Sequence, residues 1–315
     1  SIKLSALYCR YEPLQHKQAV QQIAEKLLIL VSQARIANIP VTIDAEETER
    51  LNMSLDIFNL VITDSSVQGW SGLGLAVQAY QLRASSTLHW VIALAQSLQC
   101  KIPVRLVKGA YWDSEIKRTQ VNGIKNYPVF TSKQATDVSY LACSTLILSY
   151  PDEIYPQFAT HNAHTLAAIL TLAENHPGYE FQRLHGMGEQ LYRQLLKQTS
   201  EDIPCRIYAP VGNYQDLLPY LVRRLLENGA NTSFVNNIVD DSIPLASLLE
   251  NPVSKVQGWS EKRHPGIALP LGLYGKQRRN SAGVDLTYIP ELKALATQHD
   301  FQKNKDSVSD SSIEK

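Results

Sequence analysis

Two adjacent arginines late in the chain are the residues best suited to bind an anionic group. Arg223 and Arg224 lie three and four residues after Tyr220, and Glu227 lies seven residues after it. In a helix these spacings place all four positions on one face. Two guanidinium groups side by side form a strong carboxylate clamp, because each presents a planar pair of donors. The alternative is a surface helix that carries an Arg223–Glu227 ion pair.

A second candidate is the segment Arg105-Leu-Val-Lys-Gly-Ala-Tyr-Trp112, which ends an apolar run. Arg105 and Lys108 offer positive charge to a phosphate or to a reduced ring, and Gly109 lets backbone N–H groups approach a ligand closely. Trp112 can stack on a base. The alternative is an ordinary strand end with a solvated lysine.

Two further polar groups follow apolar runs. Asp44 ends one run, and the acids after it, Glu46 and Glu47, are most simply residues of a helix N-terminus. Thr160 and His161 end another run, and His164 follows His161 at helical spacing. No third ligand accompanies the two histidines, so we expect no metal site and interpret Thr160 and His161 as donors to a cofactor phosphate or ribose.

The elements that must position these residues alternate between short β-rich runs and longer segments of helical periodicity. The expected strands are Ile2–Leu7, Pro40–Asp44, Gly74–Gln78, Pro103–Val107, Pro156–Thr160, Tyr179–Arg183 and Cys205–Ala209. The expected helices are Gln15–Ile36, Glu47–Val61, Ser85–Leu98, Ser132–Tyr150, Thr165–Glu174, Met187–Lys197 and Tyr214–Asn228. Strand–helix repeats predict a parallel sheet, because parallel neighbours need a crossover between them.

Polar residues at the carboxyl ends of so many strands favour a closed barrel over an open doubly wound sheet. A barrel collects every strand end on one rim, whereas an open sheet gathers them only near a switch point. We therefore predict an α/β fold of the (βα)8 type. Only seven strands are evident, and Ser1 has no strand–helix unit before it, so we expect the chain to begin at the second strand.

Composition excludes several classes of protein. The chain has 315 residues, 44% of them hydrophobic, which is enough for a sizeable core without disulfide or metal support. Its 30 basic and 30 acidic side chains give no net charge, so general nucleic-acid binding is not expected. The four cysteines form no Cys-x-x-Cys pair, so zinc and redox motifs have no support.

We divide the chain into a barrel over 1–236, an extension over 237–290 with a short helix at Ile243–Leu249, and a disordered tail over 291–315 that is most polar from Lys303.

Long stretches of the chain resemble the proline dehydrogenase domain of the bacterial bifunctional proline utilization A proteins. The resemblance runs from Ser1 to about Leu286. The matching stretches are Ser1–Leu7, Ile43–Glu47, Val77–Tyr80, Arg105–Arg118, Phe158–Thr165, Leu184–Glu189, Arg206–Gly212 and Leu221–Val235. It implies a distorted barrel that binds FAD noncovalently, oxidises L-proline to Δ1-pyrroline-5-carboxylate and passes electrons to a membrane quinone.

The resemblance also implies roles for individual residues. Lys3, Arg223 and Arg224 match the grip on the proline carboxylate, and Tyr208 and Tyr220 match aromatic walls of the proline pocket. Asp44 matches an acid near the substrate, and Arg105 matches the arginine beside the reactive flavin ring. FAD contacts are implied at Gln78, Arg105, Lys108, Gly109, Ala110, Trp112, Thr131, Lys133, Thr160, His161 and Glu227. The implied location is the cytoplasm or the inner-membrane surface, and an aldehyde dehydrogenase domain or chain of the same pathway is an implied partner.

Departures from the family leave alternatives open. The family usually reads His-Pro-Arg-Tyr where this chain has Tyr8-Cys9-Arg10-Tyr11. A barrel without its first strand has two unpaired edges, so we expect the chain alone to be poorly soluble or inactive unless another polypeptide supplies that strand. One alternative is an inactive fragment with a structural role or none. Another is an aldolase that forms a Schiff base on Lys108.

Overall fold

One curved, fully parallel sheet organises the protein. The computed structural model describes residues 1–198, 203–229, 250–260 and 263–298, without the side chains of residues 196, 198 and 223–229. The strands are β1 (Val41–Ile43), β2 (Leu73–Gln78), β3 (Ile102–Val107), β4 (Ile154–Ala159), β5 (Glu180–Leu184) and β6 (Cys205–Tyr208). They lie side by side in chain order, and Ile2 adds one parallel bridge to Ile43 at the β1 edge. The predicted parallel sheet is therefore confirmed.

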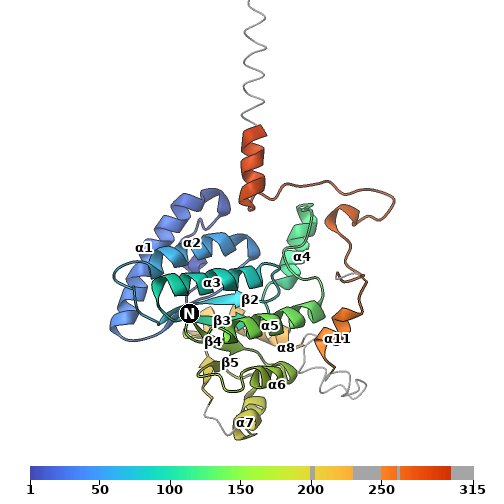
Figure 1. The fold of residues 1–315 in the computed structure, drawn as a ribbon. Coiled ribbons are helices and arrows are strands. Elements are labelled where there is room, and N and C mark those ends of the chain that lie inside the picture. The colour runs from blue at the N-terminus through green and yellow to red at the C-terminus, as the bar shows by residue number, and fades with distance from the viewer. Residues whose placement is uncertain (199–202, 230–249, 261–262, 299–315) are drawn as a thin grey trace, which may run out of the picture.

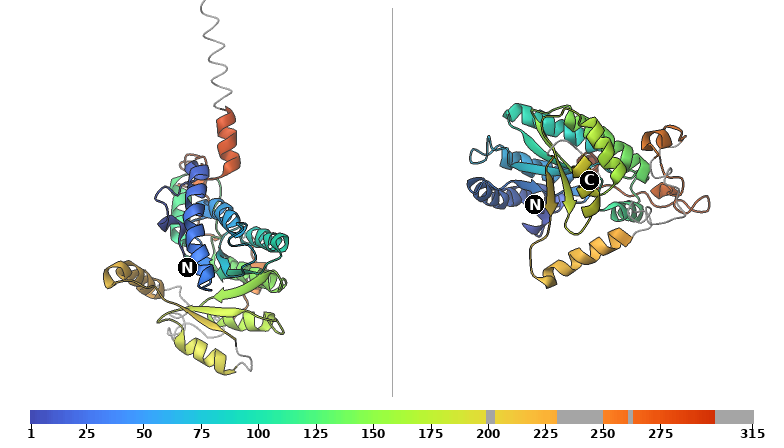
Figure 2. Two further views of the ribbon diagram at one scale, coloured as in Figure 1. Left: turned by 90° about the vertical axis from the view of Figure 1, so that its left-hand side faces the viewer. Right: turned by 90° about the horizontal axis from the view of Figure 1, so that it is seen from below.

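Helices connect the successive strands, as parallel pairing requires. The connecting helices are α2 (Leu51–Ile62), α3 (Ala84–Leu98), α4 (Trp112–Val121), α5 (Lys133–Leu148), α6 (Ala163–Leu172) and α7 (Glu189–Gln198). Helix α1 (His16–Ile36) precedes β1, and α8 (Tyr214–Gly229) and α11 (Pro252–Gln257) follow β6. Short 3-10 turns occur at Leu4–Ala6, Pro13–Gln15, Thr48–Arg50 and Pro270–Gly272. Helices α2, α3, α5 and α6 cover one face of the sheet, whereas α8 lies on the other side (Figures 1 and 2).

The apolar core lies between the covering helices and the outer face of the sheet. Alternate residues of β2 and β3, such as Leu75, Val104 and Leu106, contribute buried side chains to it, as do Ile23 of α1 and Ile57 of α2. Burying a large aliphatic side chain contributes about 1.5–3 kcal/mol. Along each strand, the residues that alternate with these core residues point to the inner face of the sheet, and many of them are polar.

The sheet must curl strongly, because side chains on distant strands touch on its inner face. The guanidinium carbon of Arg105 in β3 lies 5.7 Å from the ring centre of Tyr208 in β6. In a flat sheet strands three places apart would be separated by about 14 Å. The curl places the inner-face side chains of β1, β3, β5 and β6 around one space, as part of a barrel wall does. The expectation that this chain begins at the second strand of the barrel and lacks the first stays a prediction.

The beginning of the chain differs from the expected strand over Ile2–Leu7. Only Ile2 pairs with the sheet, and Leu4–Ala6 forms a 3-10 turn. The Ser5 N–H donates to Glu46 Oε1 at 3.0 Å and the Ala6 N–H donates to the Lys3 carbonyl at 3.1 Å. These bonds turn the backbone away from the sheet directly after Lys3.

Helix α4 is an element that the sequence did not predict. Its ten residues contain four charged side chains, and only Glu115, Ile116 and Thr119 are buried. The apolar periodicity that signals a helix is therefore missing. Asp113 and Glu115 in its first turn and Arg118 in its last complement the helix dipole.

The C-terminal part returns to the barrel. We call residues 250–285, of which 261 and 262 are not described, the strap. The Tyr127 hydroxyl donates to the Ala268 carbonyl at 2.7 Å, and Ile267 packs against a buried cluster that contains Tyr80 and Tyr127. Residues 289–298 are helical, with Pro290 and Glu291 in the first turn, although the sequence led us to expect disorder from residue 291. The expected helix at Ile243–Leu249 and the tail from Lys303 lie outside the described residues.

Candidate functional site

Arg105 lies at the centre of the candidate site, on the inner face of β3. Its Nη1 donates to Asp44 Oδ1 at 2.7 Å, its Nε donates to Gln182 Oε1 at 2.7 Å, and its Nη2 donates to Ser1 Oγ at 2.9 Å. Three of its five N–H groups are thus occupied within the described residues. The side chain is 12% exposed, so the remaining donors are held at the inner surface.

Asp44 and Tyr208 complete this cluster from opposite ends of the sheet. Asp44 follows β1 directly and its side chain is 18% exposed. Burial is the main cause that raises the pKa of the Tyr208 phenol, and the negative charge of Asp44 raises it further, whereas Arg105 and Lys3 act in the opposite direction. The phenol therefore stays protonated well into the alkaline range and can serve as a hydrogen-bond donor.

Lys3 lies at the same end of the inner surface. Its Nζ donates to the Tyr111 hydroxyl at 2.8 Å and lies 5.5 Å from the centre of that ring. Tyr220 of α8 adds to the increase in the pKa of Tyr208, which places its ring near that phenol. Helix α8 therefore approaches the site with the half-buried Tyr220.

The arginine pair lies on the helix that the sequence predicted. The backbone of Arg223 and Arg224 belongs to α8, one turn after Tyr220, and Glu227 belongs to the same helix. Spacings of three and four residues place both arginine positions on the helix face of Tyr220. The side chains of these two arginines and of Glu227 lie outside the described residues, so their contacts stay predictions.

The loop after β3 forms a second part of the site. The Ala110 N–H donates to Gln78 Oε1 at 3.2 Å, and the Gln78 amide nitrogen donates to the Glu46 carbonyl at 2.8 Å. Gly109 has a φ of +150°, and a Cβ there would lie 2.4 Å from a ring carbon of Tyr80. Only glycine fits this position, because the ring of Tyr80 occupies the place that a Cβ would take.

Cationic side chains gather next to this loop. Lys108 Nζ lies 2.5 Å from Asp137 Oδ1 in α5. Burial, together with the nearby charge of Lys108, lowers the pKa of Lys133 in the first turn of α5. A pair of lysines that share one carboxylate can accept a further anion, which would relieve the repulsion between them.

The other expected cofactor residues lie at the ends of neighbouring elements. The Trp112 indole N–H donates to the Phe130 carbonyl at 2.8 Å, and the Thr131 hydroxyl accepts the His264 N–H of the strap at 2.9 Å. The Thr160 hydroxyl accepts the Asn162 N–H at 3.2 Å, and His161 Nε2 accepts the Leu184 N–H at 3.1 Å. All of them lie beyond the carboxyl ends of β3 and β4, the rim that the sequence predicted.

The segment that follows Asp44 is fixed by ion pairs. Glu46 Oε2 and Glu47 Oε2 lie 2.6 and 3.0 Å from Arg50 Nη1. The sequence led us to interpret both acids as residues of a helix N-terminus. Glu47 does precede the 3-10 turn Thr48–Arg50, but its side chain makes no capping hydrogen bond, and both acids form ion pairs with Arg50 instead. Buried Glu115 of α4 accepts both the Thr48 N–H at 2.7 Å and the Thr48 hydroxyl at 2.8 Å. The Asp44 segment and the loop after β3 are thereby held together.

Three inner-surface residues were missed from the sequence. Tyr111 lies against Lys3, and Gln182 connects Arg105 to the buried carboxylate of Glu180. The sequence did contain a signal for Gln182 and Glu180, because polar residues two positions apart inside an apolar strand share one face.

Within the described part of the chain no helix is long and apolar enough to cross a bilayer, and no cluster of three or more side chains there could hold a metal ion.

Comparisons with known proteins agree with this geometry. The sequence model of the family described as proline dehydrogenase matches residues 1–237. The bifunctional protein PutA of Escherichia coli strain K12 is 50% identical over 309 residues, covering 94% of this chain and 23% of that protein. Proline dehydrogenase 2 of Arabidopsis thaliana mitochondria is 28% identical, covering 69% of this chain and 47% of that protein.

A solved structure shares the fold as well. Proline utilization A from Bradyrhizobium japonicum superposes with a TM-score of 0.90 and 49% identity, over 94% of this chain and 30% of that one. The chain spans about a quarter of the length of the first curated relatives that it matches. Family model, sequence identity and fold agree that this chain belongs to the proline dehydrogenase family.

Proposed function

We propose that this chain is the part of a larger enzyme that oxidises L-proline to Δ1-pyrroline-5-carboxylate with FAD. The ring carbon next to the proline nitrogen gives up a hydride, the nitrogen gives up a proton, and a C=N bond forms between them. FAD, when bound, accepts the hydride. The observation that carries this proposal is the convergence of Arg105, Asp44 and Tyr208 on one inner surface beside Lys3.

Substrate binding follows from the charges of these residues. Lys3, with Arg223 and Arg224 of α8, binds the proline carboxylate and holds one end of the substrate still while the other end reacts. Tyr208 and Tyr220 pack against the small ring and exclude water. Asp44 balances the charge of Arg105, whose free N–H groups stabilise negative charge that develops on the acceptor.

The cofactor belongs at the loop after β3 and the first turn of α5. The lysine pair there suits a pyrophosphate. The residues that would hold the cofactor are Gln78, Arg105, Lys108, Gly109, Ala110, Trp112, Thr131, Lys133, Thr160, His161 and Glu227. Electrons then pass to a membrane quinone, and an aldehyde dehydrogenase unit of the same pathway uses the product. We place the protein in the cytoplasm or on the inner-membrane surface.

The test uses the absorption spectrum of the purified full-length protein. We expect flavin bands that bleach on addition of L-proline without oxygen, and Arg223→Met or Arg224→Met to raise the KM for proline steeply. A colourless protein, or flavin that proline leaves oxidised, would refute the proposal. Borohydride trapping of a carbonyl substrate on Lys108 would favour the aldolase alternative instead.

A further inference from the structure

A chain of hydrogen bonds crosses the inner face of the sheet beneath the candidate site. It begins at Arg206 of β6, whose Nε and Nη2 lie 2.9 Å from the two carboxylate oxygens of Glu180 in β5. Gln182 donates its Nε2 to Glu180 Oε1 at 2.7 Å and accepts from Arg105 Nε at 2.7 Å. Arg105 then reaches Asp44 at 2.7 Å. The chain thus connects β6, β5, β3 and the end of β1.

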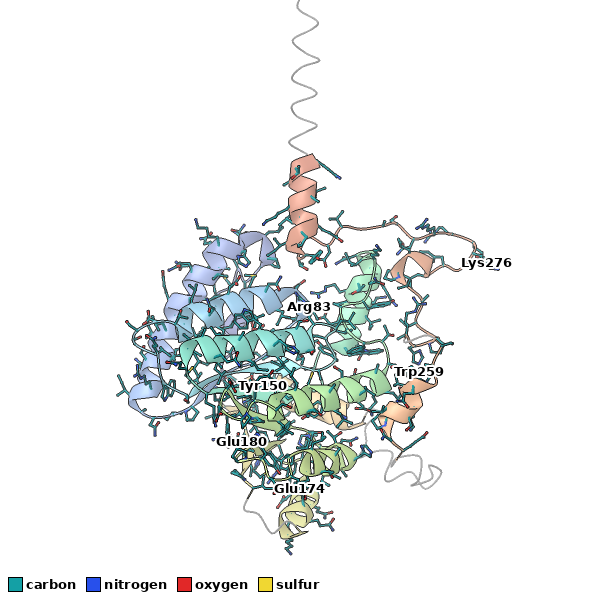
Figure 3. All side chains as sticks on the ribbon, in the orientation of Figure 1. Arg83, Tyr150, Glu174, Glu180, Trp259 and Lys276 are labelled. Atoms are coloured by element: carbon teal, nitrogen blue, oxygen red, sulfur yellow. The ribbon has the colours of Figure 1, made fainter. Side chains whose placement is uncertain are left out.

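Glu180 is the most deeply buried charged residue among those that this series of hydrogen bonds connects. Its side chain is 1% exposed and it lies within the body of the protein, whereas Lys276 of the strap lies at the periphery (Figure 3). Besides Arg206 and Gln182, it accepts from Gln157 Nε2 at 2.9 Å and contacts the Tyr155 hydroxyl at 3.4 Å. A buried carboxylate persists only when it is paired and hydrogen-bonded in this way.

The carboxylate determines which way the Gln182 amide faces. An amide has one donor end and one acceptor end. Because Glu180 only accepts, the nitrogen of Gln182 must face it, and the oxygen must face Arg105. Turning the amide over would place an N–H₂ group against the Arg105 Nε–H and an oxygen against a carboxylate. Both contacts would be repulsive, so the amide is held in one orientation.

We infer that Glu180, acting through Gln182, is a positioning residue that fixes the orientation of the Arg105 guanidinium. Two acceptors on different strands, Gln182 and Asp44, define the plane of that group. Its free N–H groups then point in one direction only. This inference deepens the proposed function, because it assigns a preorganising role to side chains that contact neither proline nor the cofactor.

The test compares two single variants and one double variant of the full-length protein with FAD. Gln182→Leu removes the acceptor for Arg105, and we expect the rate constant of flavin reduction by proline to fall about tenfold or more. We expect the midpoint potential of the bound flavin to shift as well, which a loss of fold stability alone would not cause. Tyr155→Phe is the matched control, because Tyr155 contacts the same carboxylate but not Arg105, and we expect changes of less than about twofold.

A double variant tests the hydrogen-bond pattern itself. In Glu180→Gln with Gln182→Glu, the new amide nitrogen of residue 180 can donate to residue 182, its oxygen can still accept from Arg206 Nη2, and residue 182 can still accept from Arg105, while Arg206 Nε and Gln157 Nε2 lose the acceptor that they share. We expect this exchange to restore the reduction rate to within about threefold of the wild type, if positioning is what the pair supplies. It also keeps the inference testable should Gln182→Leu fold poorly.

A crystal structure of the Gln182→Leu protein separates this inference from the proposed function. We expect the Arg105 guanidinium to turn away from its wild-type plane. An unmoved guanidinium, or a Gln182→Leu protein with kinetics like Tyr155→Phe, would overturn the inference. Wild-type protein that proline does not reduce would overturn the proposed function, while the orientation of Arg105 in the crystal would still test the positioning.

Discussion

Nη1 of Arg105 lies 2.7 Å from Oδ1 of Asp44, although β2 lies between β3, which carries Arg105, and β1, which Asp44 directly follows. Asp44→Ala leaves a guanidinium that is 12% exposed without its anionic partner. We expect the rate constant of flavin reduction to fall about tenfold or more, since an uncompensated charge at this depth reorients or attracts an ion. Asp44→Asn keeps a hydrogen-bond acceptor for Arg105, so its rate constant of flavin reduction should fall less.

Stopped-flow measurement of flavin reduction over a range of proline concentrations checks this expectation. Asp56→Asn is a suitable control, because Asp56 pairs with His16 on the surface between α1 and α2. Equal rates for Asp44→Ala and wild type would contradict the role of the ion pair.

Removing the Tyr111 hydroxyl tests the placement of Lys3. In Tyr111→Phe the Lys3 ammonium loses an acceptor at 2.8 Å but keeps the ring beneath it. We expect a higher dissociation constant for proline, about threefold to tenfold, with a smaller effect on the limiting rate. Tyr8→Phe is the matched control, because the Tyr8 ring lies 5.6 Å from Lys26 away from the site. An unchanged dissociation constant would mean that the hydroxyl does not position Lys3.

Gly109 should tolerate no side chain. Gly109→Ala places a Cβ 2.4 Å from the Tyr80 ring at a φ of +150°, so the loop after β3 must move. We expect a loss of about 1–3 kcal/mol in the free energy of unfolding and a large loss of flavin affinity. Gly178→Ala is the control, because a Cβ there meets nothing within 4 Å. Urea unfolding and flavin titration of the two variants decide the matter.

The lowered pKa of Lys133 predicts how flavin binding depends on pH. A lysine with a lowered pKa loses its proton below the ordinary value of 10.5, and the positive charge that attracts the cofactor phosphate is lost with it. Flavin affinity should therefore weaken as pH rises toward 10.5, at a lower pH than an ordinary lysine would allow. Lys133→Arg keeps its charge through this range and should show a flatter profile. Identical profiles for the two proteins would show that Lys133 does not bind the cofactor.

The strap should support the cofactor loop, even though it lies beyond the residues that the family model matches. Ile267 packs against the cluster that contains Tyr80, and the ring of Tyr80 lies directly beneath Gly109. We expect Ile267→Ala to cost about 1 kcal/mol of stability and to weaken flavin binding severalfold. Leu269→Ala changes a more exposed residue of the strap and serves as the control. Thermal unfolding and flavin titration measure both effects.

Local signals predicted the strand–helix order and the residues at strand ends, because both depend on neighbours in the sequence. Asp44 and Lys108 directly follow apolar strands, so their position on one rim could be inferred, whereas Arg105, which was expected at a strand end, lies inside β3 on its inner face. The contact between Lys3 and Tyr111 spans 108 residues and has no local signal. The role of Gln182 depends on curvature, which brings β3 and β5 together across the inner face. Helix α4 was missed because it is stabilised by charges rather than by an apolar stripe.

The division between an apolar outer layer and a polar inner surface has a consequence for how this protein can change. The cohesion of the fold comes from the contact between helices and the back of the sheet, and the residues that meet there are not those that surround the candidate site. Replacements on the concave side that leave no buried charge or hydrogen-bond donor unpaired should thus alter reactivity with a smaller loss of melting temperature than replacements in the apolar layer. New substrate preferences could arise by mutation with little structural risk.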